Sequence, residues 1–93
     1  MTDEPADEPV VRDVPERQRY EIHVGDQLGG FVQYRRNGNV VDLIHTEIDP
    51  AFEGHGLGGK LAQGALDDLR RRGLDHVATC PFIAGYLQRH PQP

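Results

Sequence analysis

Hydrophobic and polar positions alternate along much of the first half of the chain, with the two-residue period of β-strands that bury one face. The alternation occupies three segments: 20–24, 28–36 and 40–48. Gly25-Asp26 separates the first two segments, and Asn37-Gly38, a dipeptide typical of a tight hairpin, separates the last two. These short connections predict a meander of three antiparallel strands.

After Asp49-Pro50 the hydrophobic period changes to that of a helix. The apolar positions now fall at a spacing of four: Leu57, Leu61, Ala65 and Leu69. This spacing predicts an amphipathic helix from Leu57 to about Arg72, ended by Gly73 as a C-terminal cap. A short strand at 76–80 and a last helix at 82–89 complete the prediction.

The predicted order of elements is β-β-β-α-β-α. Because the fourth strand is reached through a helix, it should pair in parallel with the third by a right-handed crossover. The expected fold class is therefore α/β of the α+β type, with a mixed, mostly antiparallel sheet and two helices.

The net charge of −5 is concentrated near the N-terminus. Residues 1–16 hold three prolines and six acidic residues against a single arginine, which accounts for the whole net charge. Such a segment buries too little apolar surface to offset its ordering entropy, so we expect a disordered acidic tail at 1–16 and one folded domain at 17–93. The balanced charge of that domain argues against nucleic-acid binding.

Several classes of protein are disfavoured by the composition. No apolar run approaches the roughly 20 residues of a membrane span, and the N-terminus lacks a signal segment, so we expect a cytosolic location away from membranes. The single cysteine, Cys80, suits a reducing compartment. The histidines and Cys80 lack the spacing of metal ligands, so no metal is expected. An exposed edge strand is compatible with a monomer or a weak dimer.

The turn Gly54-His55-Gly56-Leu57-Gly58-Gly59 precedes the first predicted helix and is the strongest chemical feature. Glycine lets a backbone approach a ligand closely and direct several N–H groups toward it. The N-terminus of the following helix adds unpaired N–H groups and a partial positive charge, which together favour a phosphate. Each glycine near a helix start costs about 1 kcal/mol relative to alanine, so stability does not explain them.

Three phosphate-binding motifs overlap in this turn. The dinucleotide fingerprint is satisfied at residues 54–59, but Asp75, at nearly the expected distance, begins a strand instead of ending one. The P-loop is nearly satisfied through Lys60, yet Leu61 stands where Mg²⁺ requires a hydroxyl. The acetyl-CoA loop is met except at its first, polar position, where Glu53 replaces the usual glutamine or arginine.

Architecture separates these alternatives. A meander, a helix opened by the glycine turn and then a parallel strand resemble the core of the GNAT superfamily. The motifs that carry the resemblance are His45-Thr46-Glu47-Ile48, Phe52-Glu53-Gly54-His55-Gly56-Leu57-Gly58, Lys60-Leu61, Cys80-Pro81-Phe82 and Arg89-His90-Pro91. From about Tyr20 to Pro91, the chain is similar to the short, single-domain GNAT-like N-acetyltransferases.

The resemblance implies that acetyl-CoA is the co-substrate and that its pyrophosphate lies on the turn formed by Gly54, His55, Gly56, Leu57, Gly58 and Gly59. It also suggests that the backbone around Ile48 pairs with pantetheine and that Lys60 reaches a phosphate. Tyr86 lies where many GNAT enzymes hold a tyrosine that protonates the departing CoA thiolate, although its helical spacing from Phe82 favours a core position. Arg89 is a candidate contact for the adenine end.

Three residues are candidates for catalysis. Cys80 stands just ahead of a predicted helix, whose N-terminus stabilises a thiolate and makes the thiol more nucleophilic. The resemblance implies that Cys80 faces the acetyl thioester, where it either accepts the acetyl group or only lines the channel; a buried apolar cysteine is the alternative. His45 and Glu47 share one face of the third strand, and we expect His45 near Cys80 as a base. Glu47 is a candidate base for the amine.

The sequence therefore predicts an acetyl-CoA-binding protein that transfers the acetyl group to an unknown amine: a protein amine, a polyamine or a small metabolite. A non-catalytic module that senses or carries acyl-CoA is the first alternative, because the final strands that wall the acceptor site in larger GNAT enzymes are missing. A small protein-interaction domain is the second.

Overall fold

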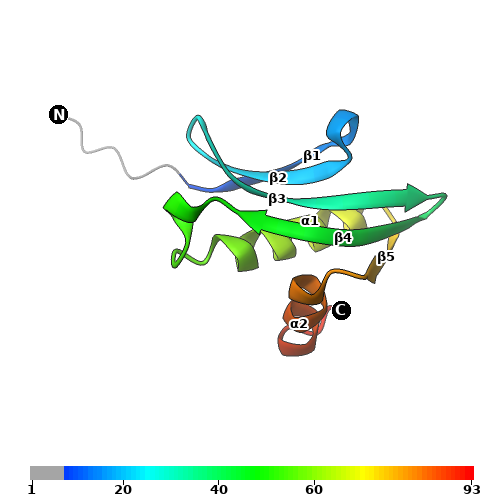
Figure 1. Cartoon of the computed structure of the whole chain (residues 1–93). Coiled ribbons are helices and arrows are strands. Elements are labelled where there is room, and N and C mark those ends of the chain that lie inside the picture. The colour runs from blue at the N-terminus through cyan, green and yellow to red at the C-terminus, as the bar shows by residue number, and fades with distance from the viewer. Residues whose placement is uncertain (1–7) are drawn as a thin grey trace.

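Within residues 8–93, the part of the chain that the structure describes, five strands form one sheet and two α-helices cover one of its faces (Figure 1). In this computed structural model the elements are β1 (Val10–Val14), η1 (Pro15–Arg17, a 3-10 turn), β2 (Arg19–Val24), β3 (Gln27–Asn37), β4 (Val40–Ile48), η2 (Pro50–Phe52, a 3-10 turn), α1 (Leu57–Arg71), β5 (Asp75–Ala78) and α2 (Pro81–Arg89). The strands lie side by side in chain order, and β5 pairs with β4 in parallel while the other pairs are antiparallel. The predicted fold class is confirmed.

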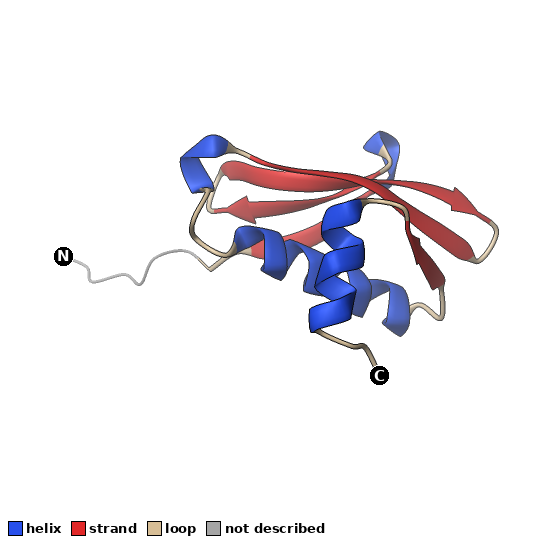
Figure 2. Cartoon of the chain, turned by 60° about the horizontal axis from the view of Figure 1, so that its bottom comes forward, coloured by secondary structure: helices blue, strands red, loops and turns tan. Residues whose placement is uncertain are grey.

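The core lies between the sheet and α1. It is built from apolar side chains that the two periodicities place on facing surfaces: Tyr20, Ile22, Val32, Val41 and Leu43 from the sheet, and Leu57, Leu61, Ala65, Leu66 and Leu69 from α1. Each fully buried leucine or isoleucine stabilises the fold by roughly 1.5–3 kcal/mol. Helix α1 contacts all five strands, whereas α2 packs on β4, β5 and α1 (Figure 2).

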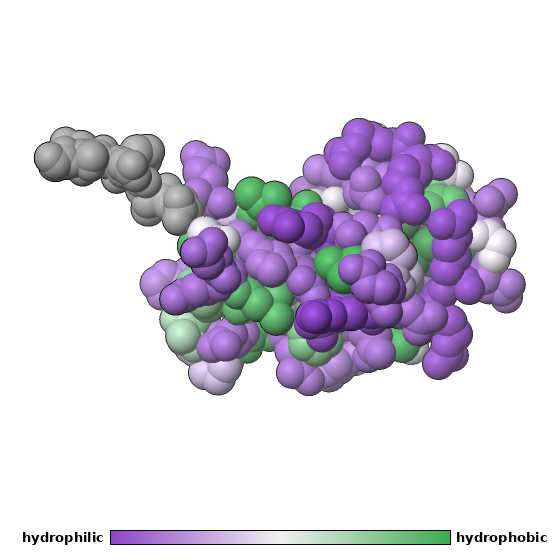
Figure 3. Space-filling view, turned by 90° about the horizontal axis from the view of Figure 1, so that it is seen from above, coloured by the Kyte–Doolittle hydropathy of each residue, from purple (hydrophilic) through white to green (hydrophobic). Residues whose placement is uncertain are grey.

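The opposite face of the sheet carries mostly hydrophilic side chains, with separate apolar ones among them (Figure 3). Glu21 is a polar residue of this face that is nevertheless buried, since only 5% of the residue is exposed. Its carboxylate accepts a hydrogen bond from Arg19 Nε and lies 2.8 Å from His23 Nε2. Burial by itself would raise the pKa of Glu21, but these hydrogen bonds outweigh it and hold the pKa below its ordinary value.

Strand β1 corrects the predicted N-terminal tail. Residues 1–7 lie outside the described residues, but Val10–Val14 pair antiparallel with β2 along their whole length. The prediction of disorder up to residue 16 is therefore wrong from Val10 onward. The physical reason is non-local: Val11 packs against the core and meets α1 at Gly64, so close that a Cβ on that glycine would lie 2.7 Å from Val11.

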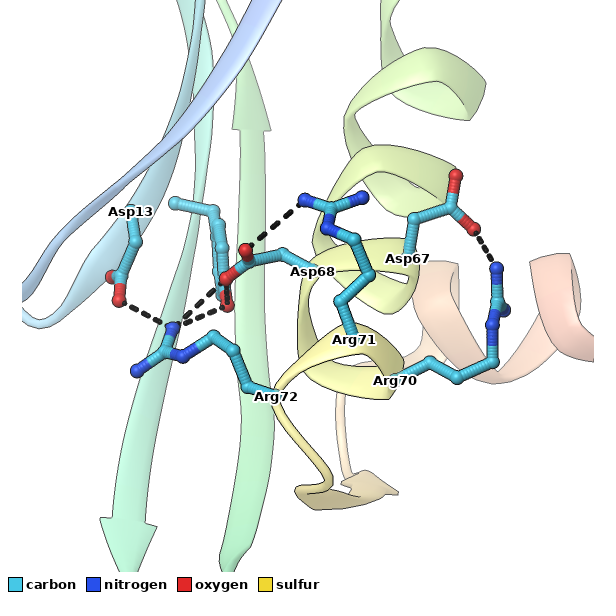
Figure 4. A network of polar contacts seen from close by, with 7 residues as sticks. Asp13, Asp67, Asp68, Arg70, Arg71 and Arg72 are labelled. Atoms are coloured by element: carbon cyan, nitrogen blue, oxygen red, sulfur yellow. Dashed lines mark hydrogen bonds and ion pairs between the residues drawn. The ribbon is translucent and has the colours of Figure 1, made fainter.

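A polar network joins β1 and β2 to the end of α1 (Figure 4). The Arg72 guanidinium lies 3.0 Å from a carboxylate oxygen of Asp13 and 2.8 Å from one of Asp68. Tyr20 donates a hydrogen bond of 2.6 Å to Asp68, and Tyr34 donates one of the same length to Asp13. Burial raises the pKa of both tyrosines, and their hydrogen bonds to the carboxylates raise it further. The network thus connects the edge strand to the helix that covers it.

The contact between β1 and α1 predicts that Gly64→Ala destabilises the protein. The new methyl group would overlap Val11, and overpacking of this kind lowers the free energy of unfolding by about 1–3 kcal/mol. Gly85→Ala in α2 is the matched control, because its nearest neighbour is the flexible end of Arg89 at 3.4 Å; it should stabilise by about 0.5–1 kcal/mol. Urea unfolding measures both. Equal stabilisation by the two substitutions would contradict the docking of β1.

The network predicts a specific acid sensitivity. Burial by itself would raise the pKa of Asp68, but hydrogen bonds from Tyr20 and Arg72 outweigh it and hold the pKa below its ordinary value. The ionised carboxylate therefore stabilises the fold above the unfolded pKa of about 3.9, and this contribution is lost as the pH falls through the folded pKa. Asp68→Asn should cost about 1–3 kcal/mol at neutral pH.

Stability measured by urea unfolding between about pH 5 and pH 2 tests this assignment. The original protein should lose more stability over this range than Asp68→Asn, whereas Asp26→Asn, in an exposed turn, should follow the original protein. Parallel curves for the original protein and Asp68→Asn would show that Asp68 is not the titrating group.

Candidate functional site

The glycine turn connects η2 to α1 and contains two residues that need glycine for their backbone conformation. Gly54 has φ +85° and Gly56, the N-cap of α1, has φ +76°, a region that side-chain-bearing residues rarely adopt. A Cβ at either position would have no neighbour within 4 Å. Backbone conformation therefore requires these glycines, and the surface beside them is open.

The turn leaves main-chain N–H groups available to a ligand. Within residues 8–93, none of the loop or turn hydrogen bonds is donated by the N–H of Gly54, His55 or Gly56. The N–H groups of the first helical turn are intrinsically unpaired as well, and Lys60 is the first to bond back, to the Gly56 carbonyl at 3.3 Å. Leu57 is 4% exposed, so it can offer only its main chain. Clustered N–H groups at a helix N-terminus are suited to a phosphate.

The other two glycines of the turn meet α2. A Cβ on Gly58 would lie 2.7 Å from the Cζ atom of Phe82, and a Cβ on Gly59 would lie 3.7 Å from the Tyr86 ring. Gly58 therefore gives Phe82 the space to lie against the first turn of α1. The two helices approach each other where α1 begins, which places α2 beside the candidate phosphate site.

Strand β5 pairs with only the first part of β4. The parallel register runs from Val40 with Asp75 to Leu43 with Ala78, and the Cys80 N–H donates one further bond of 2.8 Å to the Leu43 carbonyl. The chain then turns into α2, while β4 continues to Ile48 paired only with β3. The end of β4 thus has a free edge that faces the start of α2 and lies near the glycine turn.

Cys80 lies at this point of divergence. The residue is the N-cap of α2 and is 3% exposed. Its sulfur lies 3.4 Å from the Thr46 hydroxyl oxygen, and the described residues provide no other side-chain hydrogen bond to the thiol. The site therefore brings the thiol to the N-terminus of α2 and to the free segment of β4, with a hydroxyl as its polar neighbour.

His45 and Glu47 do not join Cys80. The pairing of β3 with β4 skips one residue, because Gln33 pairs with His45 and Tyr34 with Leu43, which leaves Ile44 as a bulge. The alternation of inward and outward side chains therefore reverses beyond Ile44. Buried Leu43 faces α1, but Thr46 now lies on that face and His45 on the other.

The expected proximity of His45 to Cys80 is therefore wrong. The two predicted bases lie on the uncovered face, where their side chains are 54% and 62% exposed and their polar ends are 2.9 Å apart. The His45 ring also meets Phe31 edge-on, at 6.4 Å between ring centroids. An extra residue in a strand changes which face later side chains occupy, and the period-two argument did not include it.

The remaining predicted contacts divide between the surface and the helix interface. His55, Lys60 and Arg89 are exposed. Tyr86 is 7% exposed, donates a hydrogen bond of 2.6 Å to Gln63 and stacks on His90 at 4.3 Å between ring centroids. Its hydroxyl therefore serves the contact between α1 and α2. Thr46 and Phe82 are site neighbours that the sequence reasoning did not single out, although both lie inside the motifs quoted above.

Two cavities formed by the described residues lie away from the glycine turn. One of about 320 Å³ lies between the C-terminal half of α1 and β5, lined in part by Leu66, Arg70 and His76. Another, of about 190 Å³, lies beside Glu47 at the end of β3 and β4 and is lined also by Leu28, Phe31 and Asp49. Only the second adjoins a predicted catalytic residue.

Two further properties concern the described residues as a set. Among them, no helix is long and apolar enough to cross a membrane. In the same residues no group of three or more histidine, cysteine, aspartate or glutamate side chains is arranged to hold a metal ion.

Comparison with known proteins identifies the family. A family model described as GCN5-related N-acetyl-transferase matches residues 19–93. The chain belongs to this family. The GNAT match includes the glycine turn, all of β4 and Cys80, whereas β1 precedes it. The resemblance drawn from the motifs is confirmed.

Relatives and solved structures agree with this assignment. Protein NATD1 of Gallus gallus and of Homo sapiens are each 39% identical to this chain over 54 residues, which are 58% of this chain and 49% and 48% of theirs. Protein NATD1 of Xenopus tropicalis is 40% identical over 53 residues, 57% of this chain and 49% of that protein. The chain thus matches about half the length of these relatives. A GCN5-like protein of Staphylococcus aureus, solved by NMR, is 21% identical with a TM-score of 0.63 over 86% of this chain and 78% of that one, which shows a shared fold.

Proposed function

We propose that this protein binds acetyl-CoA at the glycine turn and transfers its acetyl group to an amine. The observation that carries the proposal is the turn itself: unpaired N–H groups at the start of α1 stand beside the free edge of β4 in a chain of the GNAT family. The N–H groups of residues 54–59 would bind the pyrophosphate. The main chain of β4 near Ile48 would pair with the pantetheine amides.

The acceptor amine would approach from the uncovered face of the sheet. Glu47 adjoins the cavity of about 190 Å³ on that side, where its carboxylate and that of Asp49 favour a cation. Thr46 and Cys80 lie on the opposite face of the same free segment of β4. This segment is therefore the place where an amine from one face and a thioester from the other could meet, with Glu47 as the base.

A cofactor site at the turn predicts that Gly56→Ala weakens CoA binding. The substitution strains a backbone with φ +76° and puts a methyl group into the open space beside the N–H groups. Gly38→Ala is the matched control: its φ is +64°, its Cβ also meets nothing within 4 Å, and it lies in the remote β3–β4 turn. Both should lose about 1–2 kcal/mol of stability.

Calorimetric titration and thermal unfolding with CoA measure the difference. The original protein should gain about 2.7 kcal/mol at a CoA concentration 100 times Kd. Gly56→Ala should bind about tenfold or more weakly, while Gly38→Ala keeps the original Kd. If CoA stabilises neither the original protein nor the control, the proposed cofactor site is refuted.

A non-catalytic module that binds CoA or acyl-CoA is the second candidate. It is favoured by the surroundings of Cys80, whose thiol lies next to a threonine hydroxyl and apart from both predicted bases.

Direct transfer of the acetyl group to the amine and transfer through Cys80 differ in their chemical steps. In the second, the Cys80 sulfur bonds to the acetyl carbon, the bond from that carbon to the CoA sulfur breaks, and the thiol proton leaves with CoA.

Mass spectrometry after mixing with acetyl-CoA, combined with turnover on amine acceptors, separates these possibilities. Acetyl transfer through the thiol predicts a transient acetyl group on Cys80 and a large loss of turnover in Cys80→Ala. Normal turnover in Cys80→Ala would show that the thiol does not accept the acetyl group and only lines the ligand-binding channel. Tight CoA binding without an acetylated residue or product, across protein amines, polyamines and small amines, would support the module instead.

A further inference from the structure

Phe82 is an exposed aromatic residue whose position the core does not explain. Its residue is 40% exposed, and the other large hydrophobic residues that the described chain exposes are the valines Val10, Val40 and Val77. The ring nevertheless has a defined contact. It approaches Gly58 end-on, so that a Cβ there would lie 2.7 Å from Cζ and 3.4 Å from both Cε atoms.

The glycine at 58 is explained by this ring and not by its own backbone. Its φ is not positive, unlike those of Gly54 and Gly56, so an alanine could adopt the conformation. A glycine in a helix costs about 1 kcal/mol relative to alanine. The first turn of α1 therefore includes a glycine whose structural effect is to let the Phe82 ring lie against the helix while much of the residue stays in solvent.

The ring also occupies a particular place along the site. Phe82 is the second residue of α2, two positions after Cys80, and Pro81 restricts the backbone between them. On its other side lies the first turn of α1, with the unpaired N–H groups of the glycine turn. The ring therefore lies between the first turn of α1, where the phosphates are proposed to bind, and Cys80, where the thioester would lie.

We infer that Phe82 is a binding residue for the arm of the ligand between its phosphates and its thioester. This inference rests on the proposed acetyl-CoA site. The ring presents an apolar surface to the methyl-bearing, extended pantetheine chain, and the chain in turn covers the exposed part of the ring. An aromatic ring with few rotatable bonds provides such contact area at a small cost in conformational entropy. Phe82 would thus position the thioester relative to Cys80 without touching the phosphates.

The test compares two ligands that share their phosphate and adenine groups. CoA has the pantetheine arm, whereas 3′-phosphoadenosine 5′-diphosphate has the same three phosphates and lacks the arm. Phe82→Ala should weaken CoA binding about tenfold, because an aromatic contact is lost, and change binding of 3′-phosphoadenosine 5′-diphosphate less than about twofold. Val77→Ala, which removes an apolar side chain from a residue that is 48% exposed in β5, is the control and should bind both ligands as the original protein does.

A second variant gives a direct signal that does not depend on Phe82→Ala folding. The chain has no tryptophan, so Phe82→Trp introduces a single tryptophan whose emission can be followed by selective excitation. Its emission should shift to shorter wavelength with CoA and stay unchanged with 3′-phosphoadenosine 5′-diphosphate.

The outcomes separate this inference from the proposed function. If the original protein binds CoA but Phe82→Ala binds it equally well, or CoA leaves the emission of Phe82→Trp unchanged, the role of Phe82 is refuted and the cofactor site stands. Equal weakening of both ligands by Phe82→Ala would also overturn the inference, because it would assign the ring to the phosphate end. If the original protein binds neither ligand, the proposed function fails and the inference fails with it.

Discussion

The hydrogen bond from the Cys80 N–H to the Leu43 carbonyl is the contact on which the candidate site depends. It is the last main-chain connection between the two parallel strands, and β4 continues from there to Ile48 with a partner on one side only. Since α2 begins at the next residue, the divergence brings a thiol, a helix N-terminus and an unpaired strand edge to one place. A longer β5 would fill that edge with backbone pairs and leave no opening for a ligand.

The bulge at Ile44 divides this opening chemically. On one face of β4, the Thr46 hydroxyl lies next to the thiol of Cys80, a residue that is almost completely buried. On the other face, His45 and Glu47 stand in solvent. The segment of β4 beyond its pairing with β5 thus carries polar groups on both of its faces. The predicted thiol and the predicted base therefore serve different substrates in the proposed reaction, and neither activates the other.

The glycines of this protein answer different physical needs, although the sequence presents them alike. Gly54 and Gly56 are required by positive φ angles in an open turn. Gly58 and Gly64 lie on α1, where they give space to Phe82 on one side and to Val11 on the other. The first pair shapes a surface for a ligand, whereas the second pair lets a neighbouring element approach the helix. The glycine turn therefore combines an open surface at Gly54 and Gly56 with a side formed by Phe82 at Gly58.

What the sequence by itself determined was local. The strands 20–24, 28–36 and 40–48, both helices and the glycine turn follow from periodicities, turn dipeptides and caps that act over a few residues. The motifs around that turn and Cys80-Pro81-Phe82 were enough to indicate the family.

Only the tertiary structure decided what depends on partners far along the chain. The segment Val10–Val14 is flanked by prolines, and it becomes a strand because β2 pairs with it and α1 has space for Val11. The face occupied by His45 depends on the register of β4 against β3. A bulge cannot be recognised from the local alternation of hydrophobic and polar residues, yet every side chain after it lies on the opposite face. The glycine turn was therefore predictable as a ligand surface, while the groups that surround the ligand were set by pairing between distant strands.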